Sequence, residues 1–340
     1  MSANCCSANN SCCLSSLVNV QAVSTSISFK DILGTWKARW GIRRMDYAIK
    51  PGLYAVGKPG SDSIVLVSAN YKLTFDTLRK NLGDLNCWLL ILDTKGVNVW
   101  CAAGKGTFGT NELVNRIESA GLSEIVTHRK LILPQLGAAG VSAHEVTRRT
   151  GFSVTFGPVR ANDIKKFISS GYKATKEMRT VKFTFKDRFV LTPIELVEAA
   201  KIMLPVFGVL FIINLFAAQQ FEIFDVIVYA GANLSGAFIT PVLLPFIPGK
   251  AFSFKGWLTG LCWTIGVFWY FGYFNASDQF LAAGYLFLLP AVSAYLAMNF
   301  TGCSTYTSQS GVLKEMKIAL PLIIGSSIIG AALILIDKLF

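Results

Sequence analysis

Two patterns of hydrophobic residues divide the chain into two regions. Between residues 61 and 172, short apolar runs alternate with segments that carry apolar residues at three- and four-residue spacing. Short apolar runs predict buried strands, and the second spacing predicts helices. From residue 202 onward the pattern changes to long apolar runs without a charged residue. The first region therefore predicts a layered α/β domain, and the second region predicts membrane helices.

The expected elements of the first region alternate along the chain. Strands are predicted at residues 63–69, 87–93, 124–136 and 152–159. Helices are predicted at residues 74–83, 110–121, 142–151 and 161–172, with Thr74 and Ser142 as N-caps. Alternating strands and helices form a mainly parallel sheet that binds ligands at the carboxyl ends of its strands. The loops expected at those ends are 68–72, 93–110, 134–142 and 157–162, with residues 94–100 as a turn and an extended piece.

The segments around this domain have weaker patterns. Residues 1–30 are rich in Ser, Asn and Cys and predict a flexible tail, and residues 31–60 predict irregular structure. The basic, alternating segment 173–192 predicts an edge hairpin or a linker to the membrane. The expected organisation has a tail and lead-in segment at 1–44, an α/β domain at 45–180, a linker at 181–201 and a transmembrane domain at 202–340.

The apolar runs of the second region are each long enough to cross a hydrocarbon core of about 30 Å. They cover residues 202–218, 226–247, 256–274, 280–300 and 318–336. The loops between them are acidic at 219–225 and 275–279, and carry more bases than acids at 248–255 and 301–317. Because basic loops stay in the cytoplasm, the alternation predicts a five-span protein of the cytoplasmic membrane, with residues 1–201 in the cytoplasm and Phe340 outside.

Composition agrees with a membrane protein. Hydrophobic residues make up 52% of the 340 residues and charged residues 15%, against about 25% charged residues in soluble domains. The net charge of +12 belongs mostly to the first region, where we attribute it to membrane topology. Nucleic-acid binding is disfavoured because no basic cluster is interleaved with aromatic residues. The eight cysteines do not form the pattern of a small secreted disulfide framework, which favours a reducing compartment for the first region.

The stretch NVWCAAGKGTFGT, residues 98–110, carries the candidate chemistry. Its glycines match the G-x-G-x-x-G spacing of dinucleotide-binding loops at Gly104, Gly106 and Gly109. The acidic residue that should close a second strand about 20 residues later is absent, since Glu124 opens a strand instead. A nucleotide site is therefore a weak interpretation.

The cysteine of this stretch, Cys101, leaves two further interpretations open. As a nucleophile, it would need a base or a positive field. Lys105 would share a helical face with Cys101, whereas the spacing places neither histidine, His128 nor His144, beside it. As a structural residue, it would be one more small buried cysteine, which is the commonest fate of this residue type.

Residues 98–109 resemble the signature of the mercury-methylating corrinoid protein family, which is membrane-anchored and related to the large subunit of the corrinoid iron–sulfur protein. The resemblance extends from about residue 45 to the end of the chain. It implies a Rossmann-like α/β corrinoid-binding domain followed by an all-α domain of five transmembrane helices. It also implies that residues 98–105 form a cap helix under a cobalamin or related corrinoid, with Cys101 as the lower axial ligand of cobalt.

The same resemblance suggests which residues contact the cofactor. The loops around residues 134–145 and 156–163 would hold its nucleotide tail, close to His144, and His128 would be a surface or edge residue. The expected contact residues are Asn98, Trp100, Ala102, Gly104, Lys105, Thr107, Phe108, Gln135, Gly137, Ser142, Pro158 and Arg160. Asn98 would also cap the helix, and the small residues after Cys101 would let a flat ring approach the backbone.

The implied activity is methyl transfer from cobalt to Hg(II), which gives methylmercury. Hg(II) needs a methyl group with carbanion or radical character, and a thiolate is a strong, soft donor that favours this. The implied partners are a ferredoxin-like protein with two [4Fe-4S] clusters, since the chain has no C-x₂-C-x₂-C run, and a methyl-donor methyltransferase. A further hypothesis gives Cys5, Cys6, Cys12 and Cys13 a role in Hg(II) capture.

The alternative is a membrane corrinoid carrier or transport component without methyltransferase activity. A transporter would favour internal repeats and ionisable residues inside its spans. The expected spans are unrelated to one another and uncharged, which indicates anchoring more than transport.

Overall fold

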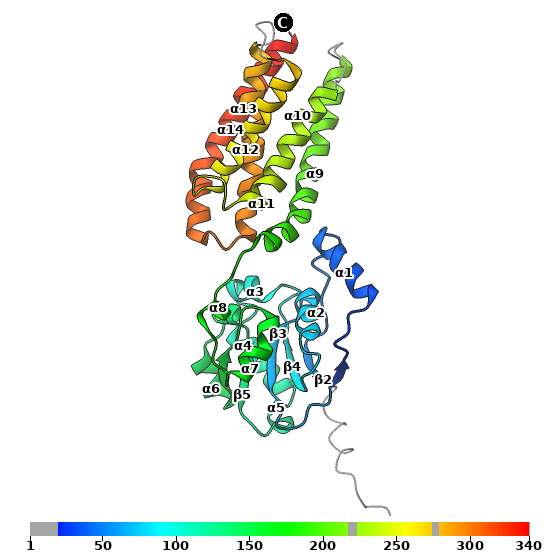
Figure 1. The fold of residues 1–340 in the computed structure, drawn as a ribbon, viewed down its shortest axis with the longest axis vertical. Coiled ribbons are helices and arrows are strands. Elements are labelled where there is room, and N and C mark those ends of the chain that lie inside the picture. The colour runs from blue at the N-terminus through cyan, green and yellow to red at the C-terminus, as the bar shows by residue number, and fades with distance from the viewer. Residues whose placement is uncertain (1–19, 217–222, 274–278, 340) are drawn as a thin grey trace, which may run out of the picture. The chain divides into compact units, whose positions relative to one another are not determined.

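The computed structural model describes residues 20–216, 223–273 and 279–339. These residues form two compact units, which Figure 1 shows as an α/β part and a helical part. The first unit extends to Val181 and the second begins at Lys182, with residues 39–41 grouped with the second.

The first unit is built on a six-stranded sheet. Its strands are β1 (Gln21–Val23), β2 (Gly52–Val56), β3 (Val65–Ala69), β4 (Cys87–Leu92), β5 (Lys130–Leu133) and β6 (Ser153–Phe156). They lie in the order β1-β2-β4-β3-β5-β6. All neighbours are parallel except β2 and β4, so the expectation of a mainly parallel sheet is confirmed.

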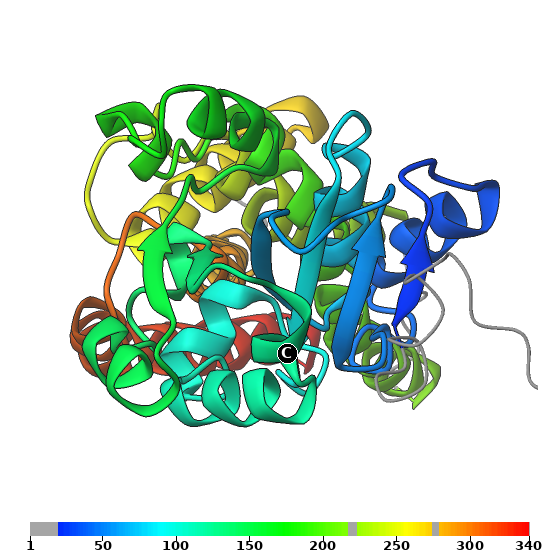
Figure 2. The ribbon, with the colours of Figure 1, turned by 90° about the horizontal axis from the view of Figure 1, so that it is seen from below.

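The helices of the first unit connect these strands and cover the sheet. They are α1 (Phe29–Arg39), α2 (Lys72–Lys80), α3 (Val99–Lys105), α4 (Thr110–Ser119), α5 (Leu122–Ile125), α6 (Ala143–Thr150), α7 (Ile164–Ser169) and α8 (Lys176–Arg179). Two short 3-10 turns, η2 (Gln135–Gly137) and η3 (Ala161–Asp163), follow β5 and β6. Figure 2 shows the sheet from below, between helices.

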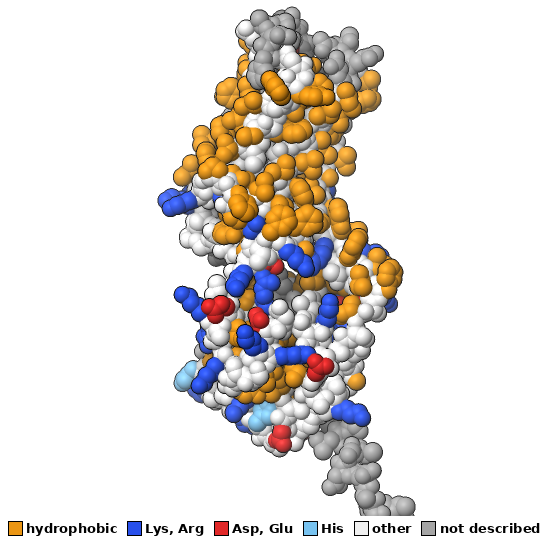
Figure 3. Space-filling view, viewed as in Figure 1, with side chains coloured by type: hydrophobic (Ala, Val, Ile, Leu, Met, Phe, Trp, Pro, Cys, Tyr) orange, Lys and Arg blue, Asp and Glu red, His pale blue; other side chains and the backbone are white. Residues whose placement is uncertain are grey.

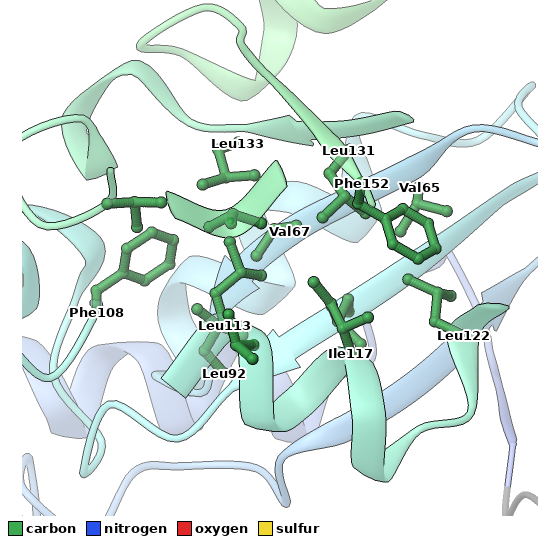
Figure 4. Packing of buried hydrophobic residues seen from close by; sticks show 14 of the residues in the cluster. Val65, Val67, Leu92, Phe108, Leu113, Ile117, Leu122, Leu131, Leu133 and Phe152 are labelled. Atoms are coloured by element: carbon green, nitrogen blue, oxygen red, sulfur yellow. The ribbon is translucent and has the colours of Figure 1, made fainter. Parts of the chain in front are cut away.

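The core of the first unit is divided between the two faces of the sheet, because side chains alternate along each strand. On one face, Val65 and Val67 of β3 pack with residues of α4 and α6, as Figure 4 shows in part. On the other face, Leu66 packs with residues of α2 and α7. A strand buried on both sides needs a continuous apolar run, which is why β3 and β4 were predictable from sequence.

Several expectations about the first unit are wrong in detail. Residues 31–60 are not irregular, since they contain most of α1 and all of β2. Helix α2 begins at Lys72, which places Thr74 inside the helix. His128 was expected inside the strand predicted at 124–136, but it lies before β5. Its Nε2 is 2.9 Å from the carbonyl oxygen of Ser63. Within the described chain, residues 173–192 contain no strand and hold α8 and the start of a long helix.

The second unit consists of helices. They are α9 (Phe185–Phe216), α10 (Ile223–Leu234), the π-turn η4 (Ser235–Ile239), α11 (Thr240–Leu243), α12 (Phe252–Phe271), α13 (Gln279–Asn299), the 3-10 turn η6 (Phe300–Cys303) and α14 (Gln309–Leu339). Helices α10 and α11 form one helical stretch through η4, so each of the five expected apolar segments contains a helix. Among the described residues, three stretches are long and apolar enough to cross a membrane, namely Ile223–Leu243, Gln279–Gly302 and Ser310–Asp337.

Glycine residues bring helices of the second unit into close contact. A Cβ atom on Gly256 of α12 would lie 2.4 Å from Cβ of Ala297, and one on Gly260 would lie 2.5 Å from Oγ of Ser293, both in α13. Small residues four positions apart are typical of helix pairs in membranes, where close backbone approach replaces hydrophobic driving force.

Candidate functional site

The candidate site is built around α3, the short helix that carries Cys101. Asn98 precedes the helix, and its Oδ1 accepts a hydrogen bond from the backbone N–H of Cys101 at 2.9 Å. Gly106 ends the helix in the left-handed region, at a φ of 79°. The role of Asn98 as N-cap is therefore confirmed, whereas the extended conformation expected up to residue 100 is wrong.

Helix α3 has one face in the core and one open face. Val99, Ala102 and Ala103 are buried. Trp100 and Gly104 are exposed, and Cys101 is half-buried, with Gly104 and Lys105 on either side of it in helical projection. A Cβ atom added to Gly104 would meet nothing within 4 Å. The thiol thus lies on a face of the helix with open space next to it.

Lys105 and Thr107 complete the end of α3. Lys105 is exposed and follows Cys101 by four residues, which puts both on the open face. Thr107 is half-buried, and its Oγ1 donates to the carbonyl oxygen of Ala102 at 3.4 Å. Lys105 is therefore available to a ligand on the open face of α3, whereas Thr107 supports the end of the helix.

The buried face of α3 packs on the η2 loop through two glycines. A Cβ atom on Gly140 would lie 2.1 Å from the carbonyl oxygen of Phe108 and 3.1 Å from Cα of Ala103. A Cβ atom on Gly137 would lie 2.5 Å from Cε1 of Phe108, whose side chain is fully buried. Ala102, Phe108 and Gly137, expected to contact a cofactor, therefore lie in this packing and away from the open face.

Substitutions at the two kinds of glycine should separate stability from ligand access. Gly140→Ala is expected to lower the free energy of unfolding by about 1–3 kcal/mol, because backbone atoms must move to make room. Gly104→Ala should stabilise α3 by up to about 1 kcal/mol, yet place a methyl group where a flat ligand would lie. Thermal unfolding and corrinoid binding, followed by absorbance, measure the two effects. Equal corrinoid affinity in Gly104→Ala and wild type would show that the open face of α3 does not contact the corrinoid.

A cavity of about 400 Å³ opens at the carboxyl ends of the strands, beside the start of α3. It lies between β3 and β5. The connection after β3 runs to β4 on one side, and the connection after β5 runs to β6 on the other side, and open α/β sheets bind ligands at such a point. The residues that line it include Ser68, Thr74, Thr77, Asn98, Trp100, Pro134, Leu136 and Pro158. Three of the predicted contact residues, Asn98, Trp100 and Pro158, are therefore brought together at one cavity.

The sequence did not predict that polar residues of β3 and α2 line the cavity. Ser68, Thr74 and Thr77 belong to this group, and their only signal is their place in and after a buried strand. The hydrophobic pattern predicted Thr74 as the N-cap of a helix, whereas in the structure Thr74 lines the cavity.

The other predicted contact residues lie in the loops that follow β5 and β6. Oε1 of Gln135 is buried and has no hydrogen-bond partner in the described part of the chain. Ser142 is exposed at the start of α6, and its backbone N–H donates to Oγ1 of Thr110 at 2.9 Å. Arg160 and His144 are also exposed. Among these residues, Gln135 gives the clearest sign of a ligand, because a buried acceptor without a donor is costly.

The thiols of the first unit differ in access. Burial raises the pKa of Cys87 to about 12, and its side chain is fully enclosed in β4. Cys101 is half-buried. His128 cannot serve Cys101 as a base, because Nε2 of His128 is bonded to Ser63 and its Nδ1 accepts from the N–H of Lys130. Cys101 is thus the accessible thiol of the α/β unit within the described residues.

Metal-binding clusters are a separate question. Over residues 20–216, 223–273 and 279–339, no group of three or more His, Cys, Asp or Glu side chains could hold a metal ion. Cys5, Cys6, Cys12 and Cys13, proposed to capture Hg(II), lie outside the described residues. A metal at Cys101 would therefore need a ligand set supplied mainly by a cofactor.

Comparison with known proteins relates the α/β unit to one family. Residues 40–168 match the family described as CO dehydrogenase/acetyl-CoA synthase delta subunit. This range contains α3, the η2 loop and the cavity. The homology therefore covers the candidate site.

Individual relatives give the same relation. The acetyl-CoA decarbonylase/synthase complex subunit gamma of Methanocaldococcus jannaschii is 30% identical over 139 residues, 40% of this chain and 28% of that protein. The subunits gamma of Archaeoglobus fulgidus and Methanopyrus kandleri are each 33% identical, over 131 and 122 residues, which cover 38% and 35% of this chain and 27% and 26% of those proteins. The chain thus spans about a quarter of the length of these curated relatives.

Proposed function

We propose that the chain is a membrane-anchored corrinoid-dependent methyltransferase, in which the sulfur of Cys101 is the lower axial ligand of cobalt and Hg(II) accepts the methyl group. The observation that carries this proposal is the half-buried thiol of Cys101 on the open face of α3, next to the empty space at Gly104. The face lies within the region that is homologous to subunits of a decarbonylase/synthase complex.

The residues present fit a large, flat cofactor with a polar tail. The open face of α3 offers one soft ligand and no side chain at residue 104, which suits a ring that approaches the backbone. The adjacent cavity of about 400 Å³ is the size of part of such a cofactor, so it would take the tail. Oε1 of Gln135 is buried without a hydrogen-bond partner among the described residues, so it would accept a hydrogen bond from a donor group of the cofactor.

The chain's own residues hold the sulfur and tune it. Asn98 fixes the backbone at Cys101, and the packing of Gly140 on Phe108 supports the buried face of α3. Lys105 is exposed on the same face, where it would donate a hydrogen bond to an amide oxygen of the cofactor. When bound, the corrinoid supplies a methyl group for transfer. The sulfur of Cys101 would hold the cobalt as a soft donor, which would suit transfer of that methyl group to an electrophile such as Hg(II).

The electron supply and the methyl donor are assigned to partners. Because the described residues contain no metal-binding cluster, electrons for cobalt would come from another protein, here a ferredoxin-like protein with two [4Fe-4S] clusters. The methyl donor would be a second methyltransferase. The relatives are themselves named as subunits of a complex, which supports a chain that works with partners.

The alternative is a membrane-anchored corrinoid carrier or transport component without its own methyltransferase activity, and relatives that are named as subunits of a complex are compatible with it. A single-turnover assay separates the two functions. The full chain, loaded with methylated cobalamin, is given Hg(II) alone. Methylmercury in stoichiometric amount supports the methyltransferase. Bound corrinoid without methylmercury supports the carrier, and a chain that binds no corrinoid overturns both.

The proposed location is the cytoplasmic membrane, with the α/β unit in the cytoplasm and five spans. The support is that each of the five apolar segments contains a helix and that, among the described residues, three helical stretches meet the length and hydropathy of a span. A reporter fused after Phe340 is expected to be active only on the extracytoplasmic side. A reporter fused within the loop at residues 248–250 should be active in the cytoplasm. Activity of both reporters on the same side would contradict the three spans expected between residue 250 and Phe340.

A further inference from the structure

Helix α1 carries a row of large hydrophobic side chains that its own unit leaves uncovered. Phe29, Ile32, Leu33, Trp36 and, just after the helix, Trp40 recur at three- and four-residue spacing, which puts them on one face. Phe29 is 78% exposed and Trp36 is 66% exposed. Figure 3 shows hydrophobic side chains gathered over α1. A continuous exposed apolar face of this kind marks an interaction surface.

The opposite face of α1 is attached to the α/β unit. Oδ1 of Asp31 accepts from Nζ of Lys72 at 2.7 Å, and its Oδ2 accepts from Nη2 of Arg79 at 2.8 Å. A Cβ atom on Gly34 would lie 2.5 Å from Oη of Tyr47, so the helix backbone lies directly against this ring. These contacts fix which side of α1 faces outward, so the apolar row is held outward by the fold.

Basic side chains flank the apolar row. Lys30 and Lys37 are seven residues apart, so they lie on one edge of it, and both are exposed and form no ion pair within the described residues. Residues 29–45 contain five basic side chains and one acidic one, Asp31, which is already bonded to Lys72 and Arg79. The surface around α1 is therefore positive as well as apolar.

We infer that α1 is an interfacial helix that lies on an anionic lipid surface, with Phe29, Ile32, Leu33, Trp36 and Trp40 in the headgroup boundary and Lys30 and Lys37 on lipid phosphates. An apolar stripe flanked by lysines, with tryptophan in the stripe, is the composition that binds in this plane. The apolar row alone would suit a protein partner, but the unpaired lysines along its edge match the negative cytoplasmic leaflet.

The inference rests on the proposed membrane location of the chain, and the experiment tests the two separately. The full chain is reconstituted into vesicles of phosphatidylcholine with phosphatidylglycerol, and a photo-crosslinking phenylalanine analogue replaces Trp36. A matched variant carries the analogue at Tyr172, an exposed aromatic residue of the same unit that lies outside α1. Flotation of the vesicles shows whether the chain is in the membrane, and mass spectrometry shows what the analogue has captured.

The expected result is a lipid adduct at position 36 and little or none at position 172. Pure phosphatidylcholine, or Lys30→Gln with Lys37→Gln, should reduce the adduct at position 36, since each lysine near an anionic surface is worth about fivefold in binding. Vesicles that float with equal adducts at both positions would overturn the inference and leave the membrane anchor intact. A peptide adduct at position 36, from a second copy or from the chain itself, would overturn it too. Vesicles that float without protein would overturn the anchor.

Discussion

Replacing Cys101 with alanine is expected to leave the α/β unit folded and to reduce methylmercury formation by about 100-fold or more, since loss of a residue that merely supports a metal ligand already costs 10- to 100-fold. The fold should survive because alanine favours helices and because Asn98 bonds the backbone of residue 101, not its side chain. The loss should come from the missing sulfur donor. Methylmercury is measured in a single turnover with a fixed amount of bound corrinoid, so that binding and transfer are distinguished.

Two variants control this result. Cys262→Ala removes an exposed thiol of α12, in a proposed membrane span, and should transfer methyl at the wild-type rate. Cys101→His replaces the soft donor with a harder one, so it should bind corrinoid with a changed absorbance spectrum and transfer methyl more slowly. A Cys101→Ala protein that forms methylmercury at the normal rate would show that sulfur is not the axial ligand.

Replacing Arg79 with methionine is expected to destabilise the N-terminal part of the α/β unit by about 3 kcal/mol. This is the low end of the cost of removing one partner from a buried ion-pair network, because Lys72 still pairs with Asp31 and Asp76. The Arg79 guanidinium donates to Asp76 at 2.7 Å, to Asp31 at 2.8 Å, and to the carbonyl oxygens of Ser24 and Ser26, each at 2.6 Å. This side chain therefore ties β1 and α1 to α2. Amide exchange of residues 21–39 in the full chain should accelerate by about 100-fold, since each 1.4 kcal/mol is a factor of ten.

A surface pair provides the matched control. Arg148 donates to Glu145 at 2.8 Å, but its side chain is 69% exposed, so Arg148→Met should cost less than about 1 kcal/mol. If the two variants exchange alike, the network around Arg79 contributes no more than a surface pair. Burial alone would raise the pKa of Asp31, but hydrogen bonds from Lys72 and Ser28 lower it well below its ordinary value. The stabilisation from Asp31 is therefore complete above the ordinary carboxylate pKa and is lost only as pH falls through the lowered one.

Local pattern was sufficient to predict the centre of the sheet but not its edge. The strands β3 and β4 are continuous apolar runs, so burial on both faces is visible in the sequence. Strand β2 is five residues long and follows a proline in a segment rich in turn signals. It becomes a strand by pairing antiparallel with β4, which is more than 30 residues away. A partner so distant in sequence leaves no local signal.

The site shows the same limit. The signature around Cys101 located the helix and its cap, because these depend on neighbouring residues. It did not reveal which of the small residues face outward: Ala102 is buried and Gly104 is open. That orientation is set by the contact of Gly140 with Phe108 and Ala103, which joins loops about 30 residues apart. Helix α1 was missed, since its residues were predicted to belong to a tail and an irregular segment, and the exposure of its apolar face depends on the tertiary contacts of Asp31 and Gly34.

The burial of Cys87 determines at which stage Hg(II), the proposed substrate, could bind to this thiol. In the folded sheet this thiol is sealed within β4 and its pKa is about 12, so a soft electrophile meets Cys101 instead. In a chain still being synthesised, the same thiol is open, and an Hg(II) ion bound there would block the closing of β4 between β2 and β3. Hg(II) should therefore interfere with the folding of newly synthesised chains, whereas chains that have already folded should be resistant to it.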